Sequence, residues 1–181
     1  GLTFNATGSA QVDTITAHAK GGVIIGGGAI DTITLGNGAD IIAYTAKDFD
    51  ALKAESGSVN STEASKLPTV GGDVITNFAV ASDDFQFSKA IQALLADKGG
   101  EVTTNWFKAH SFTDTSNPEL TAGSGPRFIY DGTTKVLYLD VEGDTAQAAG
   151  SGGAGAISNA TDDIIIATGI ADLTAADILF A

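Results

Sequence analysis

The sequence predicts a mainly β protein, a parallel β-roll that is extended by a C-terminal β-sandwich or hairpin region, with one or two short helices. Three observations favour this fold. Isoleucine recurs every nine residues near the N-terminus, an aspartate stands two positions before most of these isoleucines, and glycines fill the segments between them. A fixed short period of this kind is the mark of a repeat architecture.

The repeat covers residues 8–43 in four units, which are 8–16, 17–25, 26–34 and 35–43. Each unit has an apolar residue at its eighth position and carries aspartate or glycine two residues earlier. The isoleucines are Ile15, Ile24, Ile33 and Ile42, and the residues before them are Asp13, Gly22, Asp31 and Asp40. The units follow the calcium-binding nonapeptide G-G-x-G-x-D-x-U-x, in which U is apolar. Ala29 and Leu35 replace glycines of this template.

The template predicts about six residues of turn and three of strand in each unit, so that two units make one coil. Residues 18 apart then stack, which places Asp13 over Asp31 and Gly22 next to Asp40. Calcium prefers six to eight oxygen ligands, which carboxylates and turn carbonyls supply together. The predicted metal ligands in this region are Asp13, Gly26, Gly27, Gly28, Asp31, Gly36, Asn37, Gly38 and Asp40.

The period stops after residue 43, and we divide the single continuous domain into coils at 1–43, an insertion at 44–69 and a second half at 70–181. Within the insertion, residues 45–55 predict a helix with Thr45 as its N-cap, followed by a polar loop. The coil pattern resumes at residues 70–76, where Asp73 precedes Ile75 and is a further candidate metal ligand.

The second half predicts a short helix over 88–98, capped by Ser88, and a hairpin that turns at Asp131-Gly132. Alternating apolar residues predict a strand over 83–87. Thr174 and Asp177 form a minimal capping box before the apolar C-terminal end. Asp140, Glu142 and Asp144 alternate in a way that resembles a cation loop, and these three are candidate metal ligands as well.

Composition excludes several functions. The chain has 181 residues, 22 of them acidic and 9 basic, which gives a net charge of −13. This charge argues against nucleic acid, whose phosphates need clustered Lys and Arg. No apolar run is long enough to span a membrane. Only His18 and His110 are present, without a metalloprotease or serine-hydrolase motif, so we expect no enzyme activity.

The nonapeptide units resemble the RTX (repeats-in-toxin) β-roll. Residues 72–78 with 83–87 are similar to the strands that follow such rolls, and residues 128–144 with 164–180 are similar to the C-terminal end of many RTX proteins. The resemblance covers about three quarters of the chain. It implies calcium as the cofactor and export by the type I secretion machinery, with an uncleaved signal at the extreme C-terminus. We read Gly1 as a boundary within a longer protein.

The resemblance therefore implies a secreted, extracellular or cell-surface module that folds when it binds calcium. Its Ala-, Thr- and Gly-rich composition favours an S-layer or adhesin, with self-association or a cell-surface polysaccharide as the partner. Two alternatives stay open at this point. In the first alternative the module is the secretion tail of a hemolysin-like toxin, and in the second it is the tail of a secreted protease or lipase.

Overall fold

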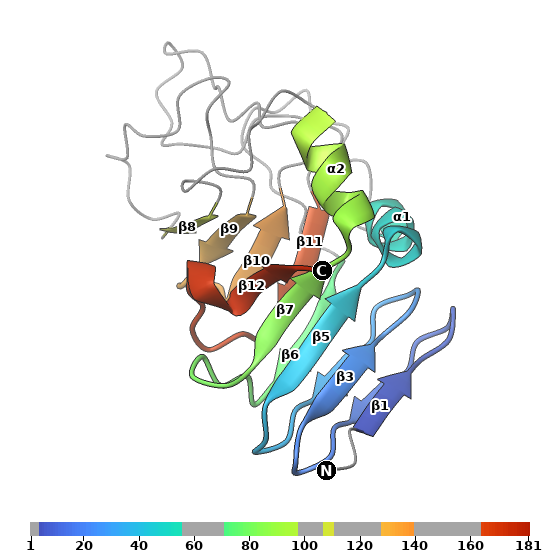
Figure 1. Ribbon diagram of the computed structural model, residues 1–181, viewed down its shortest axis with the longest axis vertical. Coiled ribbons are helices and arrows are strands. Elements are labelled where there is room, and N and C mark those ends of the chain that lie inside the picture. The colour runs from blue at the N-terminus through green and yellow to red at the C-terminus, as the bar shows by residue number, and fades with distance from the viewer. Residues whose placement is uncertain (1–3, 56–70, 98–106, 111–127, 140–163) are drawn as a thin grey trace.

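A computed structural model describes residues 4–55, 71–97, 107–110, 128–139 and 164–181. In these residues the chain is mainly β, with twelve strands, two short helices and a single 3-10 turn (Figure 1). The strands are β1 (Phe4–Thr7), β2 (Thr14–Thr16), β3 (Gly22–Ile25), β4 (Thr32–Thr34), β5 (Asp40–Tyr44), β6 (Asp73–Thr76), β7 (Asp84–Phe87), β8 (Phe107–His110), β9 (Phe128–Asp131), β10 (Val136–Leu139), β11 (Ile164–Thr168) and β12 (Ile178–Phe180). The helices are α1 (Ala46–Glu55) and α2 (Lys89–Asp97), and the 3-10 turn is η1 (Ala175–Asp177).

The strands form two sheets, and from β1 to β7 consecutive strands alternate between them. The five-stranded sheet has the order β1-β3-β5-β7-β12, and every neighbouring pair is parallel. The seven-stranded sheet has the order β2-β4-β6-β11-β10-β9-β8. Its first four strands are parallel, and β11, β10 and β9 then pair antiparallel. The predicted hairpin is confirmed as β9 and β10.

The register confirms that residues 18 apart stack. Ile15 pairs with Ile33, and Gly22 pairs with Asp40. After the insertion the same columns continue, because Ile33 pairs with Ile75. The 41 residues between those two positions include α1, yet the strand pairing is unbroken. The insertion therefore leaves the stack intact and adds a helix at one end of the strands.

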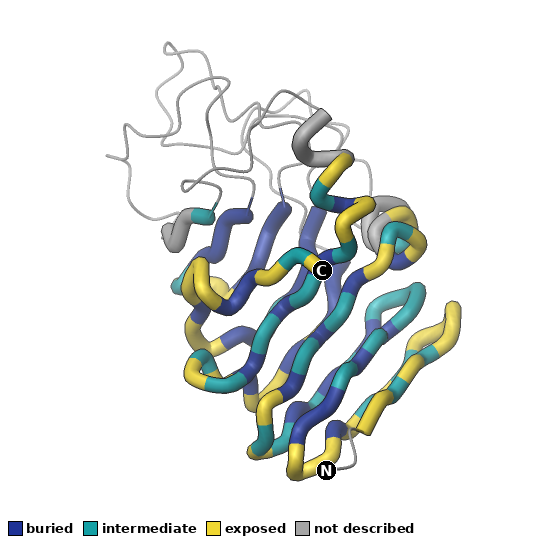
Figure 2. The backbone as a smooth tube through the Cα atoms, in the orientation of Figure 1, coloured by how far each residue is buried: buried dark blue, intermediate teal, exposed yellow. Residues whose placement is uncertain are grey.

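The core lies between the two sheets, where the apolar position of each repeat points inward. Side chains at Ile24, Ile33, Ile42, Ile75 and Phe85 are 0% exposed. Burying one such side chain contributes about 1.5–3 kcal/mol, and β-branched residues suit a strand. Figure 2 shows this alternation along β3, β5 and β7, and it shows β1 as more exposed than its neighbours.

Both helices begin where the sequence predicts. At α1 the Thr45 N–H donates to the Asp48 carboxylate at 2.7 Å, and the Asp48 N–H donates to the Thr45 hydroxyl at 3.4 Å, which makes a capping box. At α2 one detail of the prediction is wrong. Ser88 precedes the helix and its carbonyl accepts the Gln92 N–H, as at any N-cap, but its hydroxyl is buried without a hydrogen-bond partner among the described residues.

The C-terminal end closes the five-stranded sheet through the predicted capping box. The N–H and hydroxyl of Thr174 both donate to the Asp177 carboxylate, at 2.6 and 2.7 Å. This turn delivers β12 parallel to β7. The lysine N–H at the start of α2 then donates to the carbonyl of Ala181, so the chain end is held against the helix.

Candidate metal centre

Three predicted ligands form one row along the start of β2, β4 and β6. We call Asp13, Asp31 and Asp73 the Asp13 row. The N–H of Asp13 donates to Asp31 Oδ1 at 2.7 Å, and the N–H of Asp31 donates to Asp73 Oδ1 at 3.0 Å. The carboxylates of Asp31 and Asp73 thus each accept the backbone N–H of the equivalent residue in the preceding coil, and the Asp13 carboxylate accepts the N–H and hydroxyl of Ser9. The structure brings these three predicted residues together.

A second row runs along the five-stranded sheet and contains Asp40 and Asp83, which we call the Asp40 row. The N–H of Asp40 donates to Asp83 Oδ1 at 3.0 Å. The second oxygen of each carboxylate accepts an N–H four residues earlier, from Gly36 and from Ala79, both at 2.9 Å. Gly22 occupies the position opposite Asp40 where the Asp13 row has an aspartate.

Burial makes these carboxylates unusual. Asp31 is 1% exposed and Asp40 is 0% exposed. Asp31 Oδ2 and Asp40 Oδ1 are buried without any hydrogen-bond partner, and neither residue has an ion-pair partner in the part of the chain that the structure describes. A buried charge without compensation costs several kcal/mol. Among the described residues, these two carboxylate oxygens are therefore the ones for which a cation or a proton would remove the largest cost of burial.

The pKa directions agree with this geometry. Burial is the main cause that raises the pKa of Asp31, the N–H of Asp13 lowers it, and the negative charges of Asp13 and Asp48 raise it further. Burial is also the main cause that raises the pKa of Asp40, and the charge of Asp83 adds to the rise, whereas the N–H groups of Gly36 and of Gly22 in the preceding coil lower it. The rows therefore hold more negative charge than their backbone donors balance.

Tyr44, at the end of β5, satisfies one carboxylate of the Asp13 row. Its hydroxyl donates to Asp73 Oδ2 at 2.9 Å and lies 3.3 Å from the carbonyl of Ile166. Burial, followed by the charge of Asp73, raises the pKa of Tyr44 well above its ordinary value, so the hydroxyl keeps its proton. Asp73 consequently has a partner on each oxygen, unlike Asp31.

The glycine turn of residues 26–28 packs tightly against the Asp13 row and the preceding turn. A Cβ at Gly26 would come within 2.6 Å of Asp31 Oδ2 and 3.2 Å of Asp73 Oδ2. Gly27 has a φ of +107°, and a Cβ there would collide with the carbonyl of Ser9. Ala29 adopts a φ of +69°, at the template position where glycine is expected. Small residues here keep the turns close enough to stack.

The second glycine turn, residues 36–38, lies beside the Asp40 row. Its Gly36 N–H binds Asp40, and a Cβ on Gly38 would collide with the backbone of Lys20 and Gly21 in the preceding coil. Asn37 is exposed. The remaining predicted ligands, Asp140, Glu142 and Asp144, lie outside the described residues.

Carboxylates alone do not complete a metal site here. Among the described residues, no group of three or more His, Cys, Asp or Glu side chains is arranged to hold a metal ion. Any cation would need backbone carbonyls as further ligands, which the two glycine turns can supply. The donor set is made only of oxygen, and it includes two buried oxygens without partners, so it fits a hard divalent cation.

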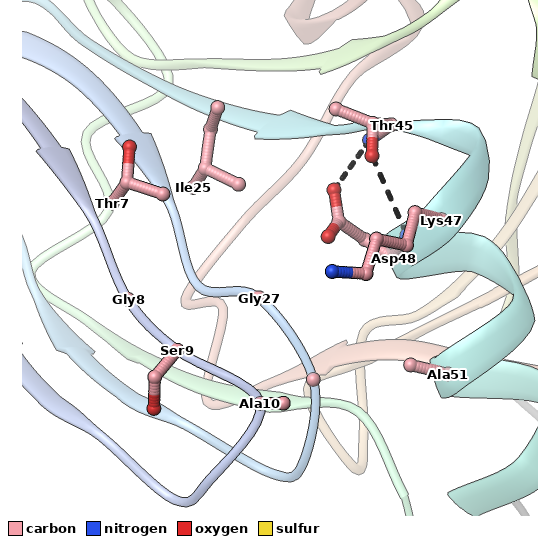
Figure 3. Close-up of a pocket in the computed structure, with 11 residues that line it drawn as sticks. Thr7, Gly8, Ser9, Ala10, Ile25, Gly27, Thr45, Lys47, Asp48 and Ala51 are labelled. Carbon is pink, nitrogen blue, oxygen red and sulfur yellow. Dashed lines mark hydrogen bonds between the residues drawn. The ribbon is translucent and has the colours of Figure 1, made fainter.

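A pocket of about 390 Å³ lies between the turns that follow β1 and β3 and the beginning of α1 (Figure 3). Ser9 and Gly27 form one wall, and Lys47 and Asp48 form the other. The Asp48 carboxylate is held by Thr45, as the dashed line in Figure 3 shows. None of the predicted carboxylate ligands lines this pocket, so we do not place the metal centre in it.

Three residues around the rows escape sequence reasoning: Asp83, Tyr44 and Asp48. Asp83 stands two residues before the buried Phe85, and this is the spacing that identified the other aspartates. The spacing between aspartate and apolar residue therefore also marks Asp83, although Asp83 lies outside the nonapeptide repeat. For Tyr44 and Asp48 no local signal exists, because both reach the Asp13 row only through the path of the chain after β5.

Comparison with protein-family models and with curated proteins found no match for this chain. Among the described residues, neither helix is long and apolar enough to cross a membrane. The candidate metal centre therefore rests on its own geometry.

Proposed function

We propose that this chain is a calcium-binding β-roll module of the RTX type, whose folding depends on the metal. The observation that carries the proposal is that two carboxylate oxygens, Asp31 Oδ2 and Asp40 Oδ1, are buried without a hydrogen-bond partner among the described residues. Both lie beside glycine turns that stack at 18-residue intervals. The alternation of β1 to β7 between two sheets, in each of which these strands run parallel, supports the β-roll.

Calcium is the cation that suits these ligands best. It accepts oxygen ligands in flexible geometry, whereas magnesium demands a near-ideal octahedron and keeps its waters. Asp31, with Asp13 and the carbonyls of residues 26–28, would hold one ion. Asp40, with the carbonyls of residues 36–38, would hold another. A bound ion supplies positive charge that compensates the buried carboxylates.

The same residues explain why folding would respond to calcium. Without a cation, burial of Asp31 and Asp40 opposes folding, and the glycine turns lose much conformational freedom when they become ordered. Backbone N–H groups offset only part of this cost. Binding to the folded state alone adds about 2.7 kcal/mol per site when free calcium is 100 times the dissociation constant.

The biological setting follows from the resemblance and from this dependence on metal. Calcium is scarce in the bacterial cytosol and abundant outside, so the chain would remain unfolded during type I secretion and fold on arrival. We place it in an S-layer or adhesin, where the acidic surface of one copy could bind its neighbours through calcium. The alternative roles are the secretion tail of a hemolysin-like toxin or of a secreted enzyme.

Calorimetry and circular dichroism test the metal function directly. We expect calcium to bind the chelator-treated protein and to raise its melting temperature, and we expect Asp31→Asn and Asp40→Asn each to reduce the number of bound ions. Asp50→Asn is the matched control, because Asp50 is an exposed α1 residue outside both rows. Equal calcium binding by all variants would contradict the proposed ligands.

Light scattering against calcium separates the biological roles. Growth into ordered assemblies supports the S-layer or adhesin. A calcium-loaded monomer at all concentrations supports a passive secretion tail instead.

A further inference from the structure

We propose that the buried carboxylate of Asp48, on helix α1 of the insertion, strengthens the calcium site at Asp31 through its charge, so that calcium binding and the docking of α1 favour each other. This inference rests on the proposed calcium function and deepens it, because Asp48 lies outside the nonapeptide repeat. Asp48 acts here through space and is not a metal ligand. The inference follows from the packing of α1, the burial of Asp48 and the path of the chain at Tyr44.

Helix α1 packs against the glycine turn of residues 26–28. A Cβ on Gly28 would lie 3.6 Å from the Ala51 Cβ of α1, which is ordinary van der Waals contact. At the other end of the same turn, a Cβ on Gly26 would lie 2.6 Å from Asp31 Oδ2. The turn whose carbonyls we propose as calcium ligands therefore lies beside both α1 and the unpartnered oxygen of Asp31.

Asp48 brings a negative charge to this contact. It is only 7% exposed, and it lines the cavity between α1 and the turn, across from Gly27 and Gly28 (Figure 3). One carboxylate oxygen, Oδ2, accepts the Thr45 N–H at 2.7 Å. Lys47 lines the same cavity but is exposed, and among the described residues no ion pair joins a cation to Asp48. The charge of Asp48 is therefore compensated only by the backbone at the start of the helix.

The charge of Asp48 acts on the Asp13 row. Burial is the main cause that raises the pKa of Asp31, and the charges of Asp13 and Asp48 add to the rise. Burial and then the charge of Asp73 lead the rise in the pKa of Tyr44, to which the charges of Asp31 and Asp48 also contribute. Charges in a buried setting interact more strongly than they do in water. Asp48 would therefore repel Asp31 in the metal-free protein and attract a calcium ion bound there.

The path of the chain fixes Asp48 relative to the row. The hydroxyl of Tyr44, the last residue of β5, donates to Asp73 Oδ2 at 2.9 Å. The next residue, Thr45, begins α1 and forms the capping box with Asp48. The strand end that contacts the row thus also sets the position of Asp48. By thermodynamic reciprocity, if docked α1 raises the affinity for calcium, bound calcium must stabilise the docked helix by the same factor.

Calcium titration calorimetry of Asp48→Asn tests the inference, because asparagine keeps an acceptor for the Thr45 N–H and removes the charge. We expect the affinity of one site to fall at least about fivefold while the number of bound ions stays the same. Asp50→Asn removes an exposed carboxylate of the same helix and is the matched control, with an expected change below about twofold. In the parent, hydrogen exchange of the α1 amides should slow more than that of the α2 amides between half-saturating and saturating calcium, and Asp48→Asn should reduce this difference.

A double-mutant cycle in chelator isolates the pair of carboxylates. Asp48→Asn should raise the melting temperature of the parent by about 2–4 °C, because it relieves the repulsion with Asp31, and it should bring no gain in the Asp31→Asn background. Any damage to the helix cap affects both backgrounds equally and cancels in the cycle.

The outcomes separate this inference from the proposed function. If the parent binds calcium and Asp48→Asn binds it with the same affinity, the coupling is overturned and the calcium function stands. An equal shift of melting temperature in both backgrounds also overturns the coupling, because Asp48 then serves only as a helix cap. If the parent binds no calcium, the proposed function is overturned together with this inference.

Discussion

The N–H of Asp13 donates a hydrogen bond to Oδ1 of Asp31, 18 residues later in the chain, across a distance of 2.7 Å. This contact joins two successive coils through a carboxylate in place of a carbonyl. It explains why aspartate, and not merely a polar residue, recurs in the repeat. One carboxylate oxygen binds the preceding coil, and the other is left for the turn, for Tyr44 or for a cation.

The first prediction concerns the orphaned oxygen of Asp31. Asp31→Asn keeps an acceptor for the Asp13 N–H and removes the buried charge, so in chelator it should stabilise the protein by about 1–2 kcal/mol. In saturating calcium the same variant should be less stable than the parent, because a metal ligand is lost. Urea unfolding in chelator and in calcium measures both effects. If the variant is less stable than the parent in both conditions, Asp31 carries no metal-dependent penalty.

The second prediction concerns pH in the absence of metal. The pKa values of Asp31 and Asp40 are raised above the ordinary value of 3.8, so the folded state binds more protons than the unfolded state. The stability contributed by these groups is fully present below pH 3.8 and is lost as pH rises through their folded pKa values. The chelated protein should therefore gain stability from Asp31 and Asp40 as pH falls from neutrality toward 4.

The control for this pH effect is the double variant Asp31→Asn, Asp40→Asn. Its unfolding free energy should depend less steeply on pH over the same range, as measured by urea titrations at each pH. Parallel curves for parent and double variant would show that these two carboxylates do not cause the dependence.

The third prediction concerns Ala29, which holds a φ of +69°. Left-handed backbone costs an L-residue about 1–2 kcal/mol, whereas glycine adopts it freely. Ala29→Gly should therefore raise the free energy of unfolding by about 1 kcal/mol. Ala39→Gly is the matched control, because Ala39 lies in the next turn without a positive φ, and there glycine should be neutral or destabilising. Equal effects at both positions would contradict the conformational argument.

The fourth prediction concerns Tyr44. Tyr44→Phe removes the hydroxyl that donates to Asp73 Oδ2 and so takes one hydrogen bond away from a buried carboxylate. We expect a loss of about 1–3 kcal/mol in the free energy of unfolding. Tyr130→Phe removes a different buried hydrogen bond, to the carbonyl of Ile170, and is the control for the loss of a hydroxyl alone. Tyr44→Phe should cost more than Tyr130→Phe, because the Tyr44 hydroxyl donates to a carboxylate and the Tyr130 hydroxyl donates to a neutral carbonyl, and equal losses would contradict this argument.

The fifth prediction compares two isoleucines of one column. Ile33 is 0% exposed, and Ile33→Ala should cost about 2–5 kcal/mol because it opens a cavity in the core. Ile15 occupies the equivalent position in the terminal coil but is only partly buried, so Ile15→Ala should cost clearly less. Thermal or urea unfolding ranks the two variants. A larger loss at Ile15 would mean that the terminal coil is more deeply packed than the structure shows.

Much of this architecture can be read from the sequence, because a nine-residue period leaves few arrangements open. Once Ile15, Ile24 and Ile33 point inward from short strands, every second unit must lie in the same sheet. The pairing of Ile15 with Ile33 follows from spacing alone. The helix start at Thr45 and the capping box of Thr174 with Asp177 can also be predicted from the sequence, because capping depends on residues only three positions apart.

The remainder depends on contacts that no local pattern contains. Ser88 looks like a side-chain cap, but its hydroxyl has no hydrogen-bond partner among the described residues, and the Lys89 N–H next to it donates to the distant carbonyl of Ala181. The aspartate carboxylates accept backbone N–H groups only when the coils are stacked. The same holds for the contact of Tyr44 with Asp73, which lies 29 residues later in the chain. The sequence predicts the aspartates as metal ligands and does not reveal their bonds to the backbone.

Isothermal titration calorimetry of the chelator-treated chain with calcium, read together with its melting temperature, is the most direct measurement of the central claim. We predict saturable binding, a rise in melting temperature, and a loss of bound ions in Asp31→Asn and Asp40→Asn but not in Asp50→Asn. No heat of binding and an unchanged melting temperature would contradict the claim that these buried carboxylates bind a divalent cation.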